Sequence, residues 1–395
     1  MRARALLFVV VALLIVGAMP AWSQAPPFPD ATPGQRFTFP RDHGAHPDFR
    51  TEWWYVTGWL RTSDGEDLGF QVTFFRSRLG TDESNPSRFA PKQMLFAHAA
   101  LADPKVGHLL HDQRIARSGF GIAEASDSDA AVVLEGWRFA RVADAAGPAT
   151  SATPSPQTLH FATRVDSDRF ALDLDLRATG PLIAQGSDAA EAGYSQKGPV
   201  ARDASRYYSV PQLTVAGSLS RGKGAERRDV KVTGTAWLDR EWSSAYLDSQ
   251  ASGWDWVGLD LDDGGALMAF RMRDRAGGKL WAGGSRRLPD GRIERFSPAD
   301  VDFATLRSWT SPGSRTTWPV MQRITIGRGA DASHDVTPLT IVVDPLMDDQ
   351  ELDSRGSTGT IYWEGAVRVR ADDATGAPIG RGYLEMTGYF RPIAF

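Results

Sequence analysis

The chain has 395 residues, of which 42% are hydrophobic and 23% are charged, and its formal net charge is −4. Because the balance is slightly acidic and the basic residues are scattered, the composition gives no indication of a nucleic-acid partner. The absence of cysteine excludes disulfides, thiol catalysis, thiolate metal ligands and a lipid anchor on cysteine.

The N-terminus has the pattern of a secretory signal peptide. Two arginines within the first four residues precede an apolar run over 5–19, and small residues around Ser23 follow it. The run is shorter than the about 20 residues of a membrane span, so an uncleaved anchor is the weaker alternative. We expect residues 1–23 to be removed and the mature chain to be periplasmic or secreted, with membrane contact through the signal peptide only. Residues 24–36, rich in Pro and Ala, are expected to be a flexible lead-in.

The first aromatic strand is expected over 53–60, where Trp53 and Tyr55 alternate with Trp54. Since large side chains occupy both of its faces, a curved sheet that encloses a cavity accounts for the pattern. A buried core strand without a ligand accounts for it equally well. An Asp-Gly pair and a second apolar run follow, which predicts a β-hairpin.

Glu52 stands directly before this aromatic run. A carboxylate that is buried without a partner costs free energy, and His46 and Arg50 are close enough in sequence to supply one. We therefore treat Glu52 as a candidate acid or base of a site.

Short extended runs separated by turn signals continue to the C-terminus. In 169–177, apolar and mostly charged residues alternate, which is typical of a strand with one solvated face. The run 94–101 carries His98, a candidate ligand-binding residue. No long stretch has a strong helical period, and 13 tryptophans favour a sheet core or an aromatic pocket. These patterns predict an all-β protein of barrels or sandwiches.

Each half of the chain contains an aromatic strand, an Asp-Gly turn and an apolar strand that ends in Phe-Arg. In the second half the aromatic strand carries Trp254 and Trp256. This repetition predicts an internal duplication into two related domains. We place their boundary in the polar, Gly-rich stretch near residue 220, giving domains 37–222 and 223–395. The alternative is that this stretch is a hairpin tip that links the domains through long strands.

A second aromatic cluster lies at 237–242, where a strand would place Trp237, Asp239 and Glu241 on one face. Two carboxylates on one face repel each other unless one is protonated or a cation lies between them. General acid–base catalysis and metal binding both use such pairs, so Asp239 and Glu241 are candidate catalytic residues. A solvated strand end with surface ion pairs accounts for the pattern equally well.

A third cluster joins Tyr362 to Glu364. A buried glutamate among aromatic residues can have a raised pKa and act as an acid, or it can accept hydrogen bonds from backbone amides. The sequence contains no His-Glu-x-x-His pattern, no nucleophile elbow and no phosphate-binding loop. We therefore expect neither a metal nor a cofactor.

Five motifs spread over almost the whole mature chain have a common counterpart. They are His-Pro-Asp-Phe-Arg-Thr-Glu-Trp-Trp-Tyr at 46–55, Tyr-Tyr-Ser at 207–209, Trp-Leu-Asp-Arg-Glu-Trp at 237–242, Tyr-Trp-Glu-Gly at 362–365 and Tyr-Leu-Glu-Met-Thr-Gly at 383–388. They resemble the AttH-like and carotenoid 1,2-hydratase (CrtC-like) family of two-domain lipocalin-like proteins. The similarity is greatest to its exported branch, loosely called predicted secreted hydrolases.

The resemblance implies two calycin-type, lipocalin-like β-barrels packed together, with an apolar ligand pocket. Members include carotenoid hydratases and fungal cyclases of the Diels–Alder type. The hydratases carry a His-Asp-His-Asn-Trp type motif, of which this chain keeps Asp239 and Trp242. Their downstream catalytic aspartate falls near Arg271 and Met272, where this chain has no carboxylate, so hydration by that residue set is not expected.

The expected function is binding or carriage of an apolar or amphipathic small molecule, such as a lipid, an isoprenoid or a polyketide-like compound. The alternative is an enzyme, a hydratase, cyclase, isomerase or hydrolase, that uses Glu52, Asp239 and Glu241. If the two halves are related barrels, their aromatic stretches could face each other across a cleft with convergent carboxylates; otherwise each tryptophan fills its own barrel. The candidate ligand-binding residues are Trp53, Trp54, Tyr55, His98, Tyr208, Trp237, Trp242, Trp254, Trp256, Tyr362 and Glu364.

Overall fold

The structure is a computed structural model that describes residues 28–80, 83–142, 151–222, 227–329 and 331–393. The predicted signal peptide, 1–23, and the start of the lead-in lie outside these residues. Within the described ranges no helix has the length and apolarity that are needed to cross a bilayer. Two short 3-10 helices are present in this part of the chain, η1 (Arg41–His43) and η2 (Pro156–Thr158), and the remaining elements are strands.

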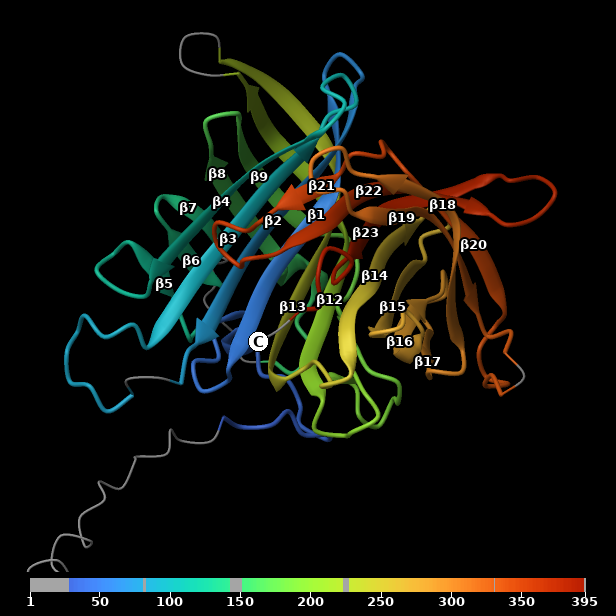
Figure 1. Ribbon diagram of the computed structural model, residues 1–395, viewed down its shortest axis with the longest axis horizontal. Coiled ribbons are helices and arrows are strands. Elements are labelled where there is room, and N and C mark those ends of the chain that lie inside the picture. Colours follow the sequence, from blue (N-terminus) through green and yellow to red (C-terminus); the bar gives the residue numbers. More distant parts are fainter. Residues whose placement is uncertain (1–27, 81–82, 143–150, 223–226, 330, 394–395) are drawn as a thin grey trace, which may run out of the picture.

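The first sheet forms a nearly closed barrel (Figure 1). Its strands are β1 (Thr51–Thr62), β2 (Asp67–Arg78), β3 (Gln93–Ala102), β4 (Leu109–Arg117), β5 (Ala123–Ala125), β6 (Ala131–Leu134), β7 (Trp137–Arg141), β8 (His160–Asp166), β9 (Phe170–Ala178), β10 (Ile183–Ala184), β11 (Tyr194–Gln196), β12 (Ala204–Arg221) and β13 (Arg228–Ala245). Their order is β4-β3-β2-β1-β13-β12-β9-β8-β7-β6-β5, and β10 and β11 pair with β12.

The second sheet forms a half-barrel. Its strands are β14 (Ala251–Leu261), β15 (Ala266–Asp274), β16 (Lys279–Arg287), β17 (Ile293–Phe296), β18 (Val301–Thr310), β19 (Thr317–Ile326), β20 (Leu339–Pro345), β21 (Glu351–Asp353), β22 (Ile361–Ala371) and β23 (Pro378–Met386). Their order is β17-β16-β15-β14-β23-β22-β20-β19-β18, and β21 pairs with β22. The prediction of an all-β protein built from two lipocalin-like barrels is thereby confirmed.

The aromatic strand of each half occupies the same place in its sheet. β1 pairs with the next strand, β2, and with the last strand of its sheet, β13. β14 likewise pairs with β15 and with the last strand, β23. Each hairpin that the Asp-Gly turns predicted is therefore present, at equivalent positions in the two sheets.

The domain boundary differs from the prediction at 222/223. β12 and β13 pair antiparallel from Ala204↔Ala245 to Arg221↔Arg228, so they form one long hairpin. Because β13 also pairs with β1 along its length, the first sheet extends to Ala245 and the chain changes sheets before Ala251. The described residues on either side of 223–226 thus pair as two long strands of one sheet, as in the alternative prediction, and residues 223–226 lie outside the described residues. Polarity and glycine mark a turn, but they do not distinguish a turn inside a domain from a linker.

Side-chain alternation gives each sheet two buried faces. One face of each sheet encloses its own core, which contains Trp54 and Trp137 in the first barrel and Trp318 and Trp363 in the second. The opposite faces pack against each other through a third cluster that joins residues of both sheets, including Tyr55, Trp237 and Trp256 from β1, β13 and β14. The barrel interiors are thus filled with side chains, and the outer faces meet.

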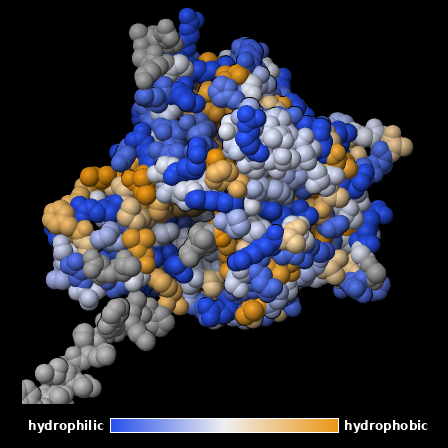
Figure 2. All heavy atoms as spheres, viewed as in Figure 1, coloured by the Kyte–Doolittle hydropathy of each residue, from blue (hydrophilic) through white to orange (hydrophobic). Residues whose placement is uncertain are grey.

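The two outer faces touch directly at one end of this contact. A Cβ added to Gly69 of β2 would lie 2.5 Å from the Cβ of Ala366 of β22, so a larger residue there would push the sheets apart. In the space-filling view hydrophilic residues cover much of the visible face, with hydrophobic residues among them (Figure 2). The largest fully buried apolar side chains, Trp54, Trp137, Trp318 and Trp363, lie inside the cores of the two barrels.

Candidate functional site

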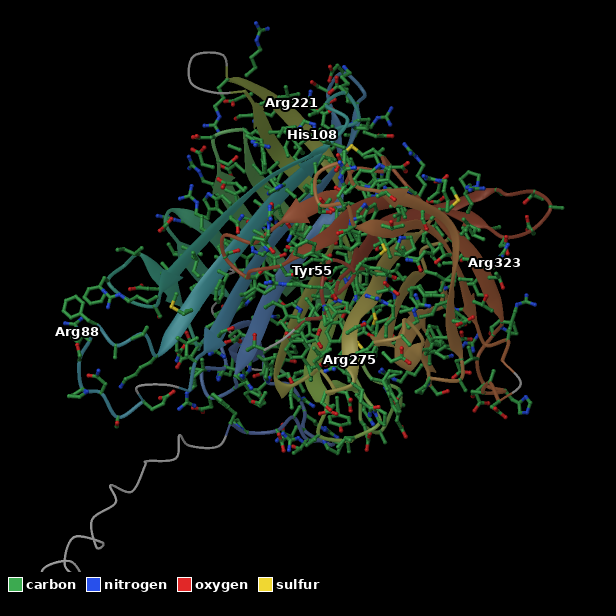
Figure 3. The ribbon with its side chains drawn as sticks, in the orientation of Figure 1. Tyr55, Arg88, His108, Arg221, Arg275 and Arg323 are labelled. Atoms are coloured by element: carbon green, nitrogen blue, oxygen red, sulfur yellow. The ribbon has the colours of Figure 1, made fainter. Side chains whose placement is uncertain are left out.

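A cavity of about 660 Å³ lies between the outer faces of the two sheets. Its volume is within the range of small-molecule pockets, about 300–1,000 Å³. Aromatic and apolar side chains make up most of its wall: Trp53, Tyr55, Phe75, Phe96, Tyr246, Trp254, Trp256, Phe270, Met272, Tyr362, Pro392 and Ile393. The ionisable side chains on the wall are His98, Lys197, Asp239, Glu241, Glu364, Glu385 and Arg391. In Figure 3, Tyr55 lies near the centre of the molecule, where the two sheets meet.

Strand alternation determines which predicted residues reach the cavity. Nine of them line it: Trp53, Tyr55, His98, Asp239, Glu241, Trp254, Trp256, Tyr362 and Glu364. The other five, Glu52, Trp54, Tyr208, Trp237 and Trp242, do not line it, and four of these point into the first barrel or its end. Glu52, predicted as a catalytic candidate, and the other four, predicted as ligand contacts, are therefore absent from the wall of this cavity, and their contacts give the reason.

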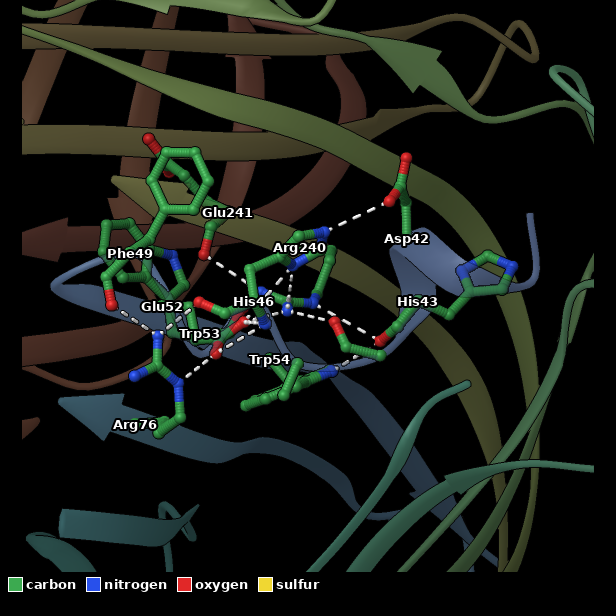
Figure 4. Close-up of polar contacts among 12 residues, drawn as sticks. Asp42, His43, His46, Phe49, Glu52, Trp53, Trp54, Arg76, Arg240 and Glu241 are labelled. Carbon is green, nitrogen blue, oxygen red and sulfur yellow. Dashed lines mark hydrogen bonds and ion pairs between the residues drawn. The ribbon is translucent and has the colours of Figure 1, made fainter. Parts of the chain in front are cut away.

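Glu52 is fully buried on the opposite face of β1 from the cavity. Its carboxylate forms ion pairs with Arg76 and Arg240 and accepts hydrogen bonds from the backbone N–H of His46 at 3.0 and 2.9 Å. Figure 4 shows it between the two guanidinium groups. Burial alone would raise the pKa of Glu52, but Arg240 and Arg76 outweigh it and hold the pKa well below its usual range. Glu52 is therefore a permanent anion inside the barrel wall, and the prediction of Glu52 as a catalytic residue places it on the wrong face.

Trp54, Tyr208 and Trp242 fasten the segment that precedes β1 to the first barrel. The indole of Trp54 donates to the carbonyl of His43 at 2.8 Å, and the Tyr208 hydroxyl is 2.6 Å from His43 Nδ1. The ring of Trp242 stacks on that of His46, with centroids 3.7 Å apart. These aromatic residues are structural in the folded chain.

Asp239 sits on the cavity wall within a set of hydrogen-bond donors. Its carboxylate accepts from the Tyr207 hydroxyl and the Ser209 hydroxyl, both at 2.5 Å, and from the Trp237 indole at 2.7 Å. Burial raises the pKa of Asp239 to about 7; the three donors lower it in part, and the charge of Glu241 raises it further. Trp237 thus contacts Asp239 but does not line the cavity itself.

Among the described residues, Glu241 has a cationic partner and Asp239 has none. Its carboxylate lies 3.2 Å from Lys197 Nζ and accepts a hydrogen bond from Ser205. The Lys197 ammonium also lies 4.2 Å from the ring centroid of Phe270. Asp239 and Glu241 therefore share one face of β13, as the alternation predicts, but their electrostatic environments differ.

A second acidic pair comes from the other sheet. Glu364 of β22 and Glu385 of β23 are directly opposite each other in the strand register, an arrangement that is unfavourable for two like charges. Glu364 accepts a hydrogen bond from the Tyr55 hydroxyl of the first sheet at 2.7 Å. Burial raises the pKa of Glu364 well above its usual range, and the charge of Glu385 raises it further. For Glu385, burial raises the pKa to about 8, against a hydrogen bond from Trp254 that lowers it.

His98 lies on the cavity wall beside these acids. Its Nδ1 is 2.5 Å from the Tyr362 hydroxyl, and its Nε2 is 2.8 Å from the Ser357 hydroxyl. Burial lowers the pKa of His98 to about 3, so the ring is neutral at physiological pH. In the part of the chain that is described, no group of three or more His, Asp or Glu residues has the arrangement of a metal site.

The sequence analysis missed Lys197, Tyr207, Ser357 and Glu385. Glu385 stands between Leu384 and Met386, so the criterion that selected Glu52, a carboxylate next to apolar residues, could have found it. Lys197 and Ser357 lie in polar segments between strands, where nothing in the local pattern sets them apart. Only the packing of the two sheets brings them to the cavity.

Comparison with known proteins places this geometry in context. A family model described as AttH-like matches residues 30–389. The crystal structure at 2.00 Å resolution of a candidate AttH protein from Nitrosomonas europaea is 45% identical, covers 92% of this chain and 100% of its own, and superposes with a TM-score of 0.79.

Two further structures are similar in fold alone. Kievitone hydratase from Nectria haematococca is 14% identical over 92% of this chain and 94% of its own, with a TM-score of 0.63. CghA in complex with Sch210972 is 13% identical over 92% of this chain and 96% of its own, with a TM-score of 0.51. Among curated proteins, none gives a significant match.

Proposed function

The chain belongs to the AttH-like family, and we propose that it is an enzyme that moves protons to and from an apolar or amphipathic small molecule in the cavity between the sheets. One observation carries this proposal. Asp239 and Glu364 are buried and Glu385 is half-buried at the cavity wall, and none of the ion pairs among the described residues includes these three acids. Burying carboxyl groups without cations lowers the stability of the folded protein. A protein that only bound an apolar ligand could have apolar residues at these positions and avoid this loss.

The environment of these groups suits proton transfer. A general acid or base works best when its pKa is near the operating pH, and burial brings the pKa of Asp239 to about 7 and that of Glu385 to about 8. Glu364 and Glu385 face each other, so at least one of them holds a proton at neutral pH and can donate it. The aromatic side chains of the wall would hold the apolar part of the substrate next to these carboxyl groups.

The reaction classes that need only such groups are hydration, dehydration, isomerisation and proton-assisted cyclisation. Kievitone hydratase, which shares the fold, is named for a hydration. Addition of water to a double bond requires one group that protonates carbon and another that takes a proton from water. The cavity has four carboxyl groups, and within the described part of the chain only Glu241 has a cationic partner; together they offer both roles.

A carrier is the second candidate, and the largely aromatic wall favours it. The two candidates differ in what happens to the bound molecule. A carrier returns its ligand unchanged, and its affinity depends chiefly on shape and apolar contact.

The test is to extract the molecules that co-purify with the mature protein, identify them by mass spectrometry, and incubate them with fresh protein in D₂O. An enzyme of the proposed kind changes their mass by water or introduces deuterium at carbon. Glu364→Gln and Glu385→Gln should reduce this conversion at least tenfold. Glu66→Gln, which removes a carboxylate that pairs with Lys105 and Arg221 far from the cavity, is the matched control. If the ligands bind but are never converted, the enzyme proposal fails and the carrier function is supported instead.

We also propose that the mature protein is exported, on the basis of the basic start, the apolar run and the small residues around Ser23. Mass spectrometry of the N-terminus of protein from cell fractions tests this. A mature chain that starts near residue 24 outside the cytoplasm is expected, and a cytoplasmic chain that keeps Met1 would contradict it.

A further inference from the structure

A chain of hydrogen bonds runs from the cavity wall along the contact between the two sheets: Tyr362, His98, Ser357 and Gln113. We infer that the Tyr362 oxygen is a hydrogen-bond acceptor for the ligand, so that the molecule in the cavity carries a hydroxyl or N–H group at this end and an acceptor such as a carbonyl toward the acids. This inference rests on the proposed function, whose site it shares. It assigns a bipolar ligand to the cavity, with an apolar frame between two polar ends.

The donor-to-acceptor direction of these hydrogen bonds follows from the last residue of the series, Gln113. The amide nitrogen of Gln113 donates to the carbonyl of Asp353 at 2.9 Å. Because a carbonyl only accepts, this contact fixes which end of the amide is the nitrogen. The amide oxygen of Gln113 therefore faces Ser357, whose hydroxyl donates to it at 2.7 Å.

Each following link then has one possible direction. Ser357 has a single proton, which Gln113 receives, so Ser357 must accept at 2.8 Å from His98 Nε2–H. His98 is 0% exposed, and burial keeps its ring neutral, so the proton on Nε2 leaves Nδ1 as an acceptor. Tyr362 consequently donates its only proton to Nδ1 at 2.5 Å. Its oxygen retains lone pairs and no proton for the cavity that it lines.

The other polar end has the opposite character. Glu364 lies two residues further along β22, on the same face, so the two side chains start roughly 7 Å apart. Tyr55 already donates to Glu364, and the raised pKa of Glu364 and of Glu385 keeps protons on this pair. A protonated carboxyl donates a hydrogen bond. One face of β22 thus presents an acceptor and a donor at a spacing that one small molecule can span.

Two probes of nearly equal shape test the accepting end. 2-Naphthol can donate a hydrogen bond and 2-methoxynaphthalene cannot. One neutral hydrogen bond is worth about 0.5–1.5 kcal/mol, so the wild type should bind 2-naphthol about 2- to 13-fold more tightly at pH 6, measured by fluorescence titration or calorimetry. Tyr362→Phe should reduce this ratio to about one.

Tyr383→Phe is the matched control. Tyr383 lies on the neighbouring strand in the cluster between the sheets, and its hydroxyl has no hydrogen-bond partner among the described residues. This variant should keep the preference for 2-naphthol. Survival of the preference in Tyr362→Phe, or its absence from the wild type while both probes bind, would overturn the inference and leave the proposed function untouched. If neither probe binds the wild type, the inference fails, and the conversion test in D₂O still decides the proposed function separately.

A second measurement needs neither a ligand nor a variant. ¹⁵N NMR of histidine-labelled protein should show neutral His98 with its proton on Nε2 and an unprotonated Nδ1. A proton on Nδ1 would reverse the chain, turn Tyr362 into a donor toward the cavity, and contradict the inference.

Discussion

Two buried acids, Glu52 and Asp239, lie on opposite faces of the same sheet and differ in charge state. Glu52 points into the first barrel, where two guanidinium groups and a backbone N–H hold it as an anion. Asp239 points from the neighbouring strand into the cavity, where it has donors but no cation among its described neighbours. Their pKa values move in opposite directions, down for Glu52 and up for Asp239.

The difference separates a structural acid from a candidate catalytic one. Burial raises the pKa of both carboxyl groups, and the neighbouring groups decide whether the net shift is down or up. A network that supplies full opposite charge makes the carboxylate part of the framework, whereas one that supplies only neutral donors keeps its proton exchangeable near pH 7. Residue type and closeness to tryptophan, on which the sequence analysis relied, are the same in both groups.

Among substitutions of these buried acids, Glu52→Gln should cause the largest loss in the free energy of unfolding. The change leaves Arg76 and Arg240 buried without their anion, which costs about 3–5 kcal/mol for buried ion pairs. Urea unfolding measures the loss. Glu364→Gln, an identical change at a buried acid that holds a proton, should cost less than about 1 kcal/mol. A greater loss in Glu364→Gln than in Glu52→Gln would reverse the roles assigned here.

The two adjacent tryptophans of β1 provide the same test with large aromatic side chains, because one lies in the barrel core and the other on the cavity wall. Trp54 is 1% exposed in the first core, so Trp54→Ala should lower the free energy of unfolding by about 3–5 kcal/mol. Trp53 is half-buried on the cavity wall, where space already exists, and Trp53→Ala should cost only about 1–2 kcal/mol. Equal losses in thermal and urea unfolding would mean that the cavity wall is packed as tightly as the core.

The pH dependence of stability has opposite signs for the two groups. The lowered pKa of Glu52 contributes stability that is present above about pH 4 and is lost as the pH falls below it. Asp239 and Glu385 have raised pKa values, about 7 and about 8, so they hold protons in the folded state that the unfolded chain releases above about pH 4. Their contribution is complete at low pH and is lost as the pH rises to about 8.

We therefore expect the free energy of unfolding to fall between pH 5 and pH 8, on the order of 1–3 kcal/mol for each group. Asp239→Asn and Glu385→Gln should each flatten this slope, as measured by urea unfolding across the range. Glu66→Gln should leave it unchanged. A slope that neither cavity variant alters would show that these carboxyl groups titrate normally.

The smallest effect concerns the hydrogen bond that joins the two sheets at the cavity, from Tyr55 to Glu364 at 2.7 Å. A double-mutant cycle of Tyr55→Phe and Glu364→Gln should give a coupling energy of about 0.5–1.5 kcal/mol. Tyr55→Phe combined with Glu66→Gln is a control pair that shares no partner, because Glu66 pairs with Lys105 and Arg221, and it should be additive within about 0.5 kcal/mol. No coupling between Tyr55 and Glu364 would mean that the hydrogen bond is absent in solution.

The fold followed from the sequence because period-two alternation and turn residues act locally. Asp64-Gly65 and Asp263-Gly264 predicted the β1–β2 and β14–β15 hairpins, and both are present. The boundary at 222/223 was misplaced because the turn between β12 and β13 carries the same polar and glycine signals as a linker.

The candidate site could be predicted from the sequence only in part. Alternation establishes that Trp53 and Trp54 point to opposite sides of β1, and that Asp239 and Arg240 point to opposite sides of β13. It does not establish which side faces a filled barrel and which faces the second sheet. That choice depends on how two distant halves of the chain pack, because only contact between the sheets brings Glu364, Glu385 and Lys197 to Asp239 and gives Glu52 its place beside two arginines. The sequence determined the strands and the candidate residues; the tertiary packing decided their neighbours, and the neighbours set the charge of each buried acid.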